Sequence, residues 1–271
     1  MSLHKNITRA DYDAIKACNY STLKHFDRSA AHARHEMLSP SEPSDAMTLG
    51  TALHTALLEP DRFEEKCAVS PELKLRTKKG REAAKEFAVA NTGKAIIRLS
   101  DFVLISKIRT AVIANDTAKS LLNGLGTNEV GLEWTDSETG LKCKGLIDRL
   151  APQNGHTAVV DIKTTANAQP WAFASAIAKF KYHEQAAFYL SGLNANARAV
   201  RRFIWIAIEK EPPFGVACYE PDATMLEQGE LLFREHLRLW KQCEASGEWP
   251  GYATGIQELS LPKWSLKVEE V

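Results

Sequence analysis

The sequence predicts an α/β protein in which a central mixed sheet is flanked by helices. Three successive segments with strand character, residues 129–136, 141–150 and 157–165, are separated by turn signals and predict an antiparallel meander. A helical stretch then leads to a further apolar strand at 201–208. A helical crossover of this kind joins parallel strands, so the expected sheet contains both strand directions.

The 271 residues are expected to form one large domain with a substantial core. A helical N-terminal extension over 1–47 precedes a core over about 48–246 and a tail over 247–271. The extension predicts two helices within residues 8–38, with Ser21 as a candidate cap of the second helix.

The core begins with a helix at about 48–58, whose apolar residues recur at helical spacing. His54 lies at the edge of that stripe, where a lone histidine is usually a packing residue. The remaining expected elements are a strand at 95–98, helices at about 101–114 and 116–123, a helix opened by Pro170 that breaks near Lys181–Tyr182, a strand at 214–220 and a long helix at about 222–246.

Composition excludes several classes of protein. The 34 Lys and Arg residues balance the 34 Asp and Glu residues, so a nucleic-acid binder would have to concentrate positive charge locally. The five cysteines form no C-x-x-C pair, which argues against a zinc ribbon or a disulfide framework and favours the cytoplasm. No apolar run is long enough for a bilayer, and T-G-K at 92–94 lacks the upstream glycine of a P-loop, so neither a membrane nor ATP is expected.

The strand at 157–165 carries an acid and a base on the same face. Side chains alternate along a strand, so Asp161 and Lys163 point to one side. A charged pair on a core strand is costly to bury without a purpose. The alternative is a solvated, inert pair near the end of the strand.

A hairpin brings a second carboxylate to this strand. N-G at 154–155 predicts a type I′ turn, which pairs Gln153 with His156 and places Asp148 opposite Asp161. Directly opposed Cβ atoms lie about 4.5–5.5 Å apart. Two carboxylates at that separation repel unless a proton or a cation lies between them. A divalent metal is the expected occupant, because Mg²⁺ takes one or two carboxylates together with water and phosphate.

These motifs resemble a known superfamily. I-D at 147–148 followed by D-I-K at 161–163 resembles the signature of the PD-(D/E)XK nucleases, with isoleucine in place of the usual proline. The resemblance implies a restriction-endonuclease-like core with the order αβββαβ, which agrees with the predicted strands and crossover.

Further stretches resemble one branch of that superfamily, the nuclease domain of the phage and prophage exonuclease VIII. They are L-G-T-A-L-H-T-A-L-L-E-P at 49–60, Y-H-E-Q-A-A-F-Y at 182–189, and E-W-P with L-S-L-P-K-W near the end. The resemblance extends from about Tyr20 to Trp264.

The candidate site residues follow from the motifs and from this resemblance. Asp148 and Asp161 are expected to bind one or two metal ions, Mg²⁺ with Mn²⁺ as a substitute, and Lys163 to stabilise developing negative charge. The resemblance adds His54 and the Ile162 carbonyl as metal ligands, and Gln185 and Tyr189 as residues that orient DNA or the catalytic strand. Glu129 is either a further active-site acid or a solvent-facing residue.

The densest basic run is R-T-K-K-G-R-E-A-A-K at 76–85. Such a run is often only a solvated face. In a DNA-processing protein it can also contact phosphates, and the candidates are Arg76, Lys78, Lys79 and Arg81.

The resemblance implies an exodeoxyribonuclease that degrades linear duplex DNA from its ends, 5′→3′, and leaves a single strand for an annealing partner. It also implies a ring-like homo-oligomer. Two alternatives stay open: an endonuclease of the same superfamily, and a non-catalytic DNA-binding or assembly module that keeps the fold.

Overall fold

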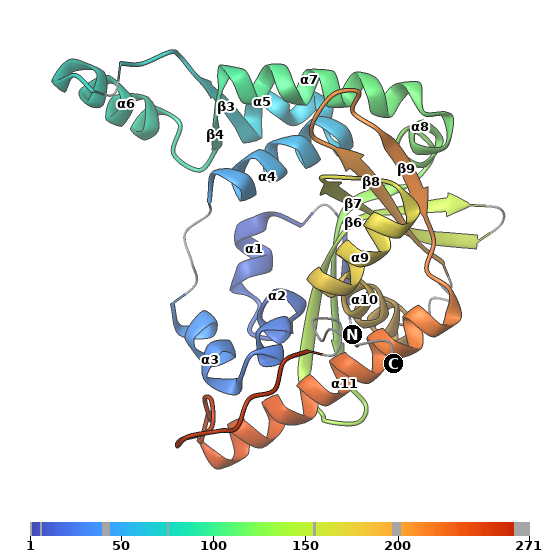
Figure 1. The fold of residues 1–271 in the computed structure, drawn as a ribbon. Coiled ribbons are helices and arrows are strands. Elements are labelled where there is room, and N and C mark those ends of the chain that lie inside the picture. Colours follow the sequence, from blue (N-terminus) through green and yellow to red (C-terminus); the bar gives the residue numbers. More distant parts are fainter. Residues whose placement is uncertain are drawn as a thin grey trace, which may run out of the picture.

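The computed structural model describes residues 2–5, 7–39, 44–74, 76–153, 156–196 and 202–262. Among these, seven strands form one central sheet in the order β1-β5-β6-β7-β8-β9, with β2 paired to β6 beside that path (Figure 1). The strands are β1 (Ser2–His4), β2 (Cys18–Asn19), β5 (Thr127–Thr135), β6 (Lys142–Gln153), β7 (His156–Thr165), β8 (Arg202–Glu209) and β9 (Val216–Tyr219).

The predicted mixed sheet is confirmed. β5, β6 and β7 form the antiparallel meander, and β8 runs parallel to β7. The predicted register is confirmed where the structure describes it, since Gln153 pairs with His156 and Leu150 with Val159. The turn at 154–155 lies outside the described residues.

Helices cover both faces of the sheet. One apolar cluster lies between the sheet and α9, α10 and α11, with the N-terminal helices packed against it; the other lies under α4, α7 and α8 (Figure 1). The helices are α1 (Arg9–Ala14), α2 (Tyr20–Leu23), α3 (Ala30–Leu38), α4 (Asp45–Leu58), α5 (Phe63–Lys66), α6 (Lys78–Ala90), α7 (Leu99–Ala114), α8 (Asp116–Asn123), α9 (Pro170–Phe180), α10 (Tyr182–Ala195) and α11 (Ala223–Ser246), with short 3₁₀ turns at Lys24–Asp27 and Pro60–Arg62.

The N-terminal segment differs from the expected pair of helices. It forms three short helices, and its strands β1 and β2 join the central sheet. Ser21 is not the cap that was expected; the Asn19 side chain accepts the Thr22 N–H at 2.8 Å and caps α2. Strands of two and three residues carry no detectable periodicity, which explains why the sequence did not predict them.

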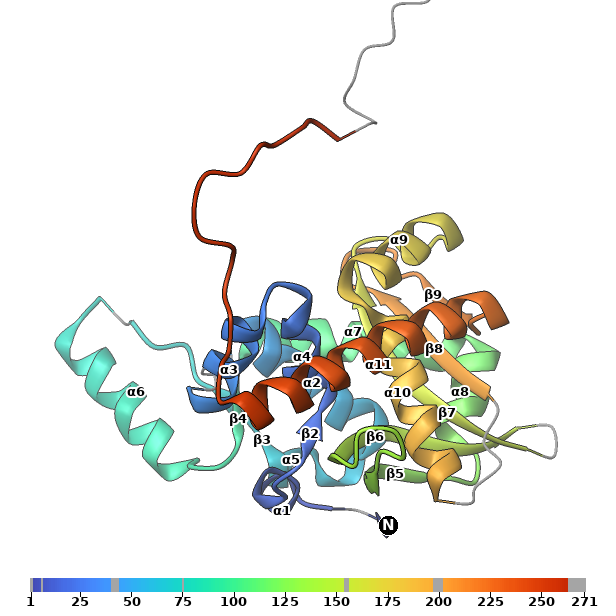
Figure 2. The same ribbon diagram turned by 90° about the horizontal axis from the view of Figure 1, so that it is seen from below.

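Helix α6 stands apart from the body of the molecule as an arm (Figures 1 and 2). It is inserted between the parallel strands β3 (Cys67–Ser70) and β4 (Ala95–Arg98), which form a separate two-stranded sheet. Thr77 caps the arm by accepting the Gly80 N–H at 3.0 Å. The basic run is therefore carried on a projecting element.

The C-terminal segment packs against the N-terminal one through Trp249, whose ring centroid lies 6.1 Å from that of Phe26. No helix in the described ranges combines the length and the apolar character that crossing a bilayer requires.

Candidate active site

The regular pairing of strand β6 (Lys142–Gln153) is interrupted at Asp148. Ile147 and Leu150 lie three residues apart yet join the same apolar cluster, so the usual alternation of side chains is broken between them. On the neighbouring strand β5, Glu129 adopts a positive φ of 47° and is left out of the ladder, although its neighbours pair in one constant register. Positive φ is uncommon for a residue other than glycine and often marks a functional site.

Asp148 lies where β6 changes partners. One edge of β6 pairs with β7 over residues 149–153 and with β2 at 143–144. The ladder with β7 ends at the pair Arg149–Val160, one step before Asp148. Instead, the Asp148 carboxylate accepts a hydrogen bond from the backbone N–H of Ile162 at 2.9 Å. This side-chain contact links β6 to β7 just beyond the end of their backbone ladder.

His54 on α4 faces this carboxylate. Its Nδ1 atom lies 3.4 Å from Asp148 Oδ2, with both side chains partly exposed. Burial lowers the pKa of His54, but the charge of Asp148 and their hydrogen bond outweigh burial and raise that pKa to about 9. For Asp148 the effects have the opposite sign. Burial raises its pKa, but the charges of His54 and Lys163 lower it by more, so the net shift of the pKa is downward. The pair is therefore ionised near neutral pH.

Asp161 and Lys163 meet as the alternation along β7 predicts. Lys163 Nζ lies 2.6 Å from Asp161 Oδ2, and the Asp161 residue is only 3% exposed. The contact is an ion pair without hydrogen-bond geometry, so this buried oxygen has a countercharge but no hydrogen-bond donor among the described residues. Burial raises the pKa of Asp161 to about 6 despite the ammonium, and Asp148 adds to that shift.

Glu129 belongs to the same acidic group. Burial raises its pKa to about 7, and the charge of Asp148 contributes. In the register of the sheet, Glu129 of β5 corresponds to Asp148 of β6. Continuing the β6–β7 ladder by one residue beyond the pair Arg149–Val160 brings Asp148 opposite Asp161. Of the two alternatives for Glu129, the structure favours a place beside the carboxylates over a solvent-facing one.

Gln185 and Tyr189 lie on one face of α10, as their spacing predicts. Gln185 Nε2 donates to the Tyr189 hydroxyl at 3.3 Å. The pKa of Tyr189 is strongly raised, first by burial, with smaller contributions from nearby acids that include Asp161 and Asp148. The Tyr189 ring rests on Gly145 of β6, where a Cβ atom would approach it to 2.9 Å. The pair thus lies next to the interruption in β6.

The donor set suits a hard divalent cation. Within the described ranges, no three His, Cys, Asp or Glu side chains converge as a ready-made metal site. Mg²⁺ does not require one, because it binds through one or two carboxylates and completes its shell with water and phosphate. The buried Asp161 oxygen without a hydrogen-bond donor, beside the ionised Asp148, fits that requirement.

The basic run is not brought to the carboxylates. Arg76 precedes α6, and Lys78, Lys79 and Arg81 lie in its first turn, all of them exposed on the arm. Lys78 is 3.9 Å from Glu82, a loose ion pair on the same helix. Any contribution of these residues to binding must come from DNA that extends beyond the active site.

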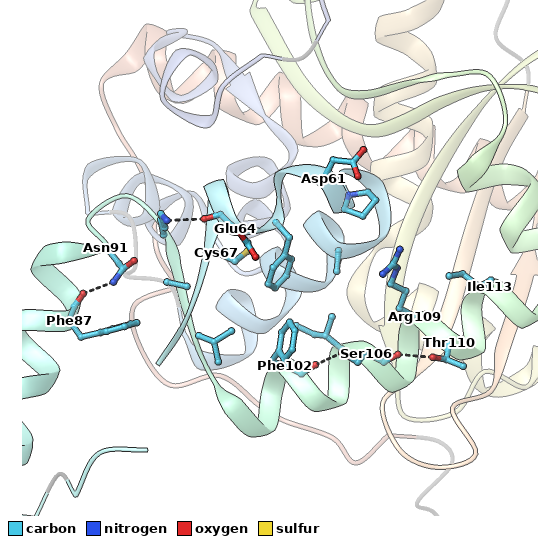
Figure 3. Close-up of a pocket in the computed structure, with 17 residues that line it drawn as sticks. Asp61, Glu64, Cys67, Phe87, Asn91, Phe102, Ser106, Arg109, Thr110 and Ile113 are labelled. Carbon is cyan, nitrogen blue, oxygen red and sulfur yellow. Dashed lines mark hydrogen bonds between the residues drawn. The ribbon is translucent and has the colours of Figure 1, made fainter. Parts of the chain in front are cut away.

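One cavity lies away from the candidate catalytic residues. It has a volume of about 850 Å³ and opens between α5, β3 and α7, at the base of the arm (Figure 3). Its wall combines the rings of Phe63 and Phe102 with polar groups such as Arg109. None of the candidate catalytic residues lines it.

Two features of the site were missed in the sequence. Tyr182 places its ring 4.8 Å from Lys163 Nζ, a cation–π contact across two elements. Glu184 is fully buried, and its Oε1 atom lies at hydrogen-bond distance, 2.8 Å, from Nδ1 of His236, which ties α10 to α11. The Y-H-E-Q stretch contained both residues, but only the fold reveals their partners.

Asp148, Asp161 and Lys163, which resemble the acids and the lysine of the PD-(D/E)XK signature, lie together at this edge of the sheet. The chain belongs to the family of PDDEXK-like domains of unknown function (DUF3799), whose profile matches residues 19–261.

One solved structure agrees with this assignment at the level of the fold. A crystal structure described as "Putative exonuclease" from Eubacterium rectale aligns with a TM-score of 0.63 at 13% identity, covering 96% of each chain. Two weaker likenesses are SSO0001 (TM-score 0.30, 19% identity, 70% of this chain and 85% of the other) and VC1899 from Vibrio cholerae (0.24, 14%, 88% and 61%). No curated protein matches the sequence.

Proposed function

We propose that this protein is a Mg²⁺-dependent exodeoxyribonuclease that degrades linear duplex DNA from its ends in the 5′→3′ direction. The observation that carries the proposal is the meeting of Asp148, Asp161 and Lys163 where β6 and β7 separate, in a chain of the PD-(D/E)XK superfamily. The structural neighbour described as an exonuclease adds support for action at DNA ends.

The residues of the chain have separate tasks in this scheme. Asp148 and Asp161 would hold the metal, with His54 and the Ile162 carbonyl as further ligands and Mn²⁺ as a substitute. When bound, the metal lowers the pKa of a water molecule and neutralises charge on the phosphate. The Ile162 N–H fixes the Asp148 carboxylate, so its orientation does not depend on the substrate.

Lys163 supplies positive charge where negative charge develops. Its ammonium is held beside Asp161 and over the Tyr182 ring, so it is positioned before DNA arrives. An ammonium has donors but no lone pair, which excludes it as a metal ligand. Gln185 and Tyr189 would orient the strand at the same edge, and Glu129 is a further acid within the group.

Assembly and partners form the outer part of the proposal. The chain carries no net charge, so its grip on DNA depends on gathered local patches, and Arg76, Lys78, Lys79 and Arg81 form the one on the arm. A ring-like homo-oligomer would collect such arms around the duplex, and the strand that remains would pass to an annealing protein. Light scattering that shows only a monomer at micromolar concentration would exclude the ring.

The test compares end-labelled linear duplex with covalently closed circular DNA, each with Mg²⁺ or EDTA. The proposal requires degradation of the linear duplex in Mg²⁺ alone, with the circle intact and the 5′ label released first. Cutting of the circle would identify an endonuclease. Binding of linear DNA without cutting under any metal condition would identify a non-catalytic module.

A further inference from the structure

The corner between α9 and α10 holds two aromatic rings in fixed positions. Lys181 turns the chain there with a positive φ of 58°. The Tyr20 hydroxyl donates to the Lys181 carbonyl at 2.6 Å, and Lys181 Nζ lies 3.3 Å from Asp27 Oδ1. The N-terminal segment therefore holds the corner through Lys181, with Phe180 and Tyr182 on either side of it.

These two rings connect the catalytic lysine with the surface. The centroids of Phe180 and Tyr182 lie 5.6 Å apart at an interplanar angle of 27°, which is a stacked arrangement. Tyr182 in turn lies under Lys163 Nζ, which contacts Asp161. Phe180 is 51% exposed, so the stack ends in a ring open to solvent.

A single exposed phenylalanine is ordinary on a protein surface. Phe180 differs because its ring stacks on Tyr182, which contacts Lys163, and because its backbone lies beside the hydrogen-bonded Lys181 carbonyl. A cation accompanies it, since Lys179 Nζ lies 5.3 Å from the centre of the ring. An aromatic surface with an adjacent cation is the chemistry that binds unpaired nucleotides, through base stacking and phosphate attraction.

We propose that the Phe180–Tyr182 ring pair stacks on the base of a nucleotide next to the scissile phosphate, with Lys179 near the flanking phosphate. This inference rests on the proposed function, because cleavage requires a phosphate beside Asp161 and Lys163. Every base has a π-face, so such stacking does not depend on sequence.

The same stack discriminates between DNA ends and DNA interiors. A base inside a duplex has both faces covered by its neighbours, whereas a terminal or unpaired base has an open face. Phe180 can therefore complete the stack only with a base at an end. The ring pair supplies a physical reason for action at ends that the carboxylates alone do not contain.

The experiment combines a protein change with a DNA change. Phe180→Leu keeps apolar bulk but removes the π-face, and the DNA carries an abasic site at one of its first four nucleotides. Single-turnover cleavage of normal DNA by the variant should require roughly 5- to 150-fold more DNA for half-maximal rate, since stacking contributes about 1–3 kcal/mol per base. With the abasic site at one of the four positions, the wild type should need more DNA by the same factor, whereas Phe180→Leu should show no additional change.

Trp171 provides a matched control. It is 69% exposed on the same helix, about two and a half turns before Phe180, and therefore on the opposite side. Trp171→Leu should show independent, multiplicative effects of mutation and abasic site. The same multiplicative result for Phe180→Leu would overturn the proposal. Both residues are exposed, so melting temperatures should stay at the wild-type value.

A binding measurement separates this inference from the proposed nuclease activity. A 2-aminopurine at the DNA end loses fluorescence when it stacks on an aromatic ring, and Ca²⁺ in place of Mg²⁺ allows the measurement without cleavage. Quenching that is lost in Phe180→Leu and kept in Trp171→Leu supports the stack even if the wild type cuts no DNA. Equal quenching in all three proteins would refute it, even if the nuclease is active.

Discussion

Lys163 contacts the Asp161 carboxylate and the Tyr182 ring. Lys163→Ala should lower single-turnover cleavage by a factor on the order of 10²–10³, because one well-placed stabilising charge is lost from the transition state. Lys163→Gln should be similarly poor, since it keeps length and a donor without the charge.

The control for Lys163 is metal binding at pH 8, measured by calorimetry on the same preparations. Burial keeps the pKa of Asp161 at about 6 with the lysine present, and losing the ammonium raises it further, so the measurement must be made well above that range. Retained Mg²⁺ binding with lost cleavage supports a catalytic role. Joint loss of metal and fold would make Lys163 a structural partner of Asp161 instead.

His54 gives a pH-dependent prediction. Its pKa of about 9 means that the imidazole is mostly protonated at pH 8, and only the neutral form can bind a metal. If His54 is a ligand, Mg²⁺ binding at pH 8 should release close to one proton. The release is measured by calorimetry in buffers of different ionisation enthalpy.

The matched variant for this measurement is His54→Gln, which should bind Mg²⁺ without releasing the proton. As the pH rises through 9, release by the wild type should decline towards zero, because the imidazole is already neutral. Negligible release at pH 8 by the wild type would show that His54 stays a charged partner of Asp148 rather than becoming a ligand.

At the scale of elements, the packing of α10 against β6 depends on the absence of a side chain at Gly145. A Cβ atom at Gly145 would approach the Tyr189 ring to 2.9 Å, so Gly145→Ala must displace that ring and its bond to Gln185. We expect a loss of roughly 1–3 kcal/mol in the free energy of unfolding, together with slower cleavage.

Gly50→Ala is the control for this substitution. Nothing lies within 4 Å of a Cβ atom there, and alanine favours helix α4, so stability should stay equal or rise by roughly 0.5–1 kcal/mol. Both values come from urea denaturation. Equal free energies of unfolding for the two variants would mean that the Tyr189 ring can shift without loss of stability.

The difference between local spacing and contacts between elements explains how far the sequence could predict the site. The pairing of Gln153 with His156, and the shared face of Asp161 and Lys163, follow from local spacing and were predictable. The interrupted pairing at Asp148 was not, because it accompanies a positive φ at Glu129, on another strand, that local spacing does not reveal. The Tyr182 contact with Lys163 likewise depends on how α10 packs against the sheet.

At the scale of the whole molecule, the arm should make the affinity for DNA depend on salt. Each phosphate contact that is lost lowers the slope of log affinity against log salt by about 0.9. Lys79→Ala on the arm should weaken duplex binding and reduce that slope. Lys241→Ala, an exposed lysine on α11 with the same charge, should change neither. Indistinguishable slopes in fluorescence anisotropy titrations would exclude the arm as a DNA contact.

Strand β2 has a practical consequence for the boundaries of this domain. The family match begins at residue 19, yet the Lys144 ammonium, which is buried, donates to the carbonyls of Tyr12 and Ile15 at 2.8 Å. A chain trimmed to the family boundary would leave that charge without these acceptors and would remove Cys18, the β2 partner of Cys143 on the edge of β6. Expression of the trimmed chain should therefore yield aggregates, and the stretch before the family match is part of the smallest soluble nuclease unit.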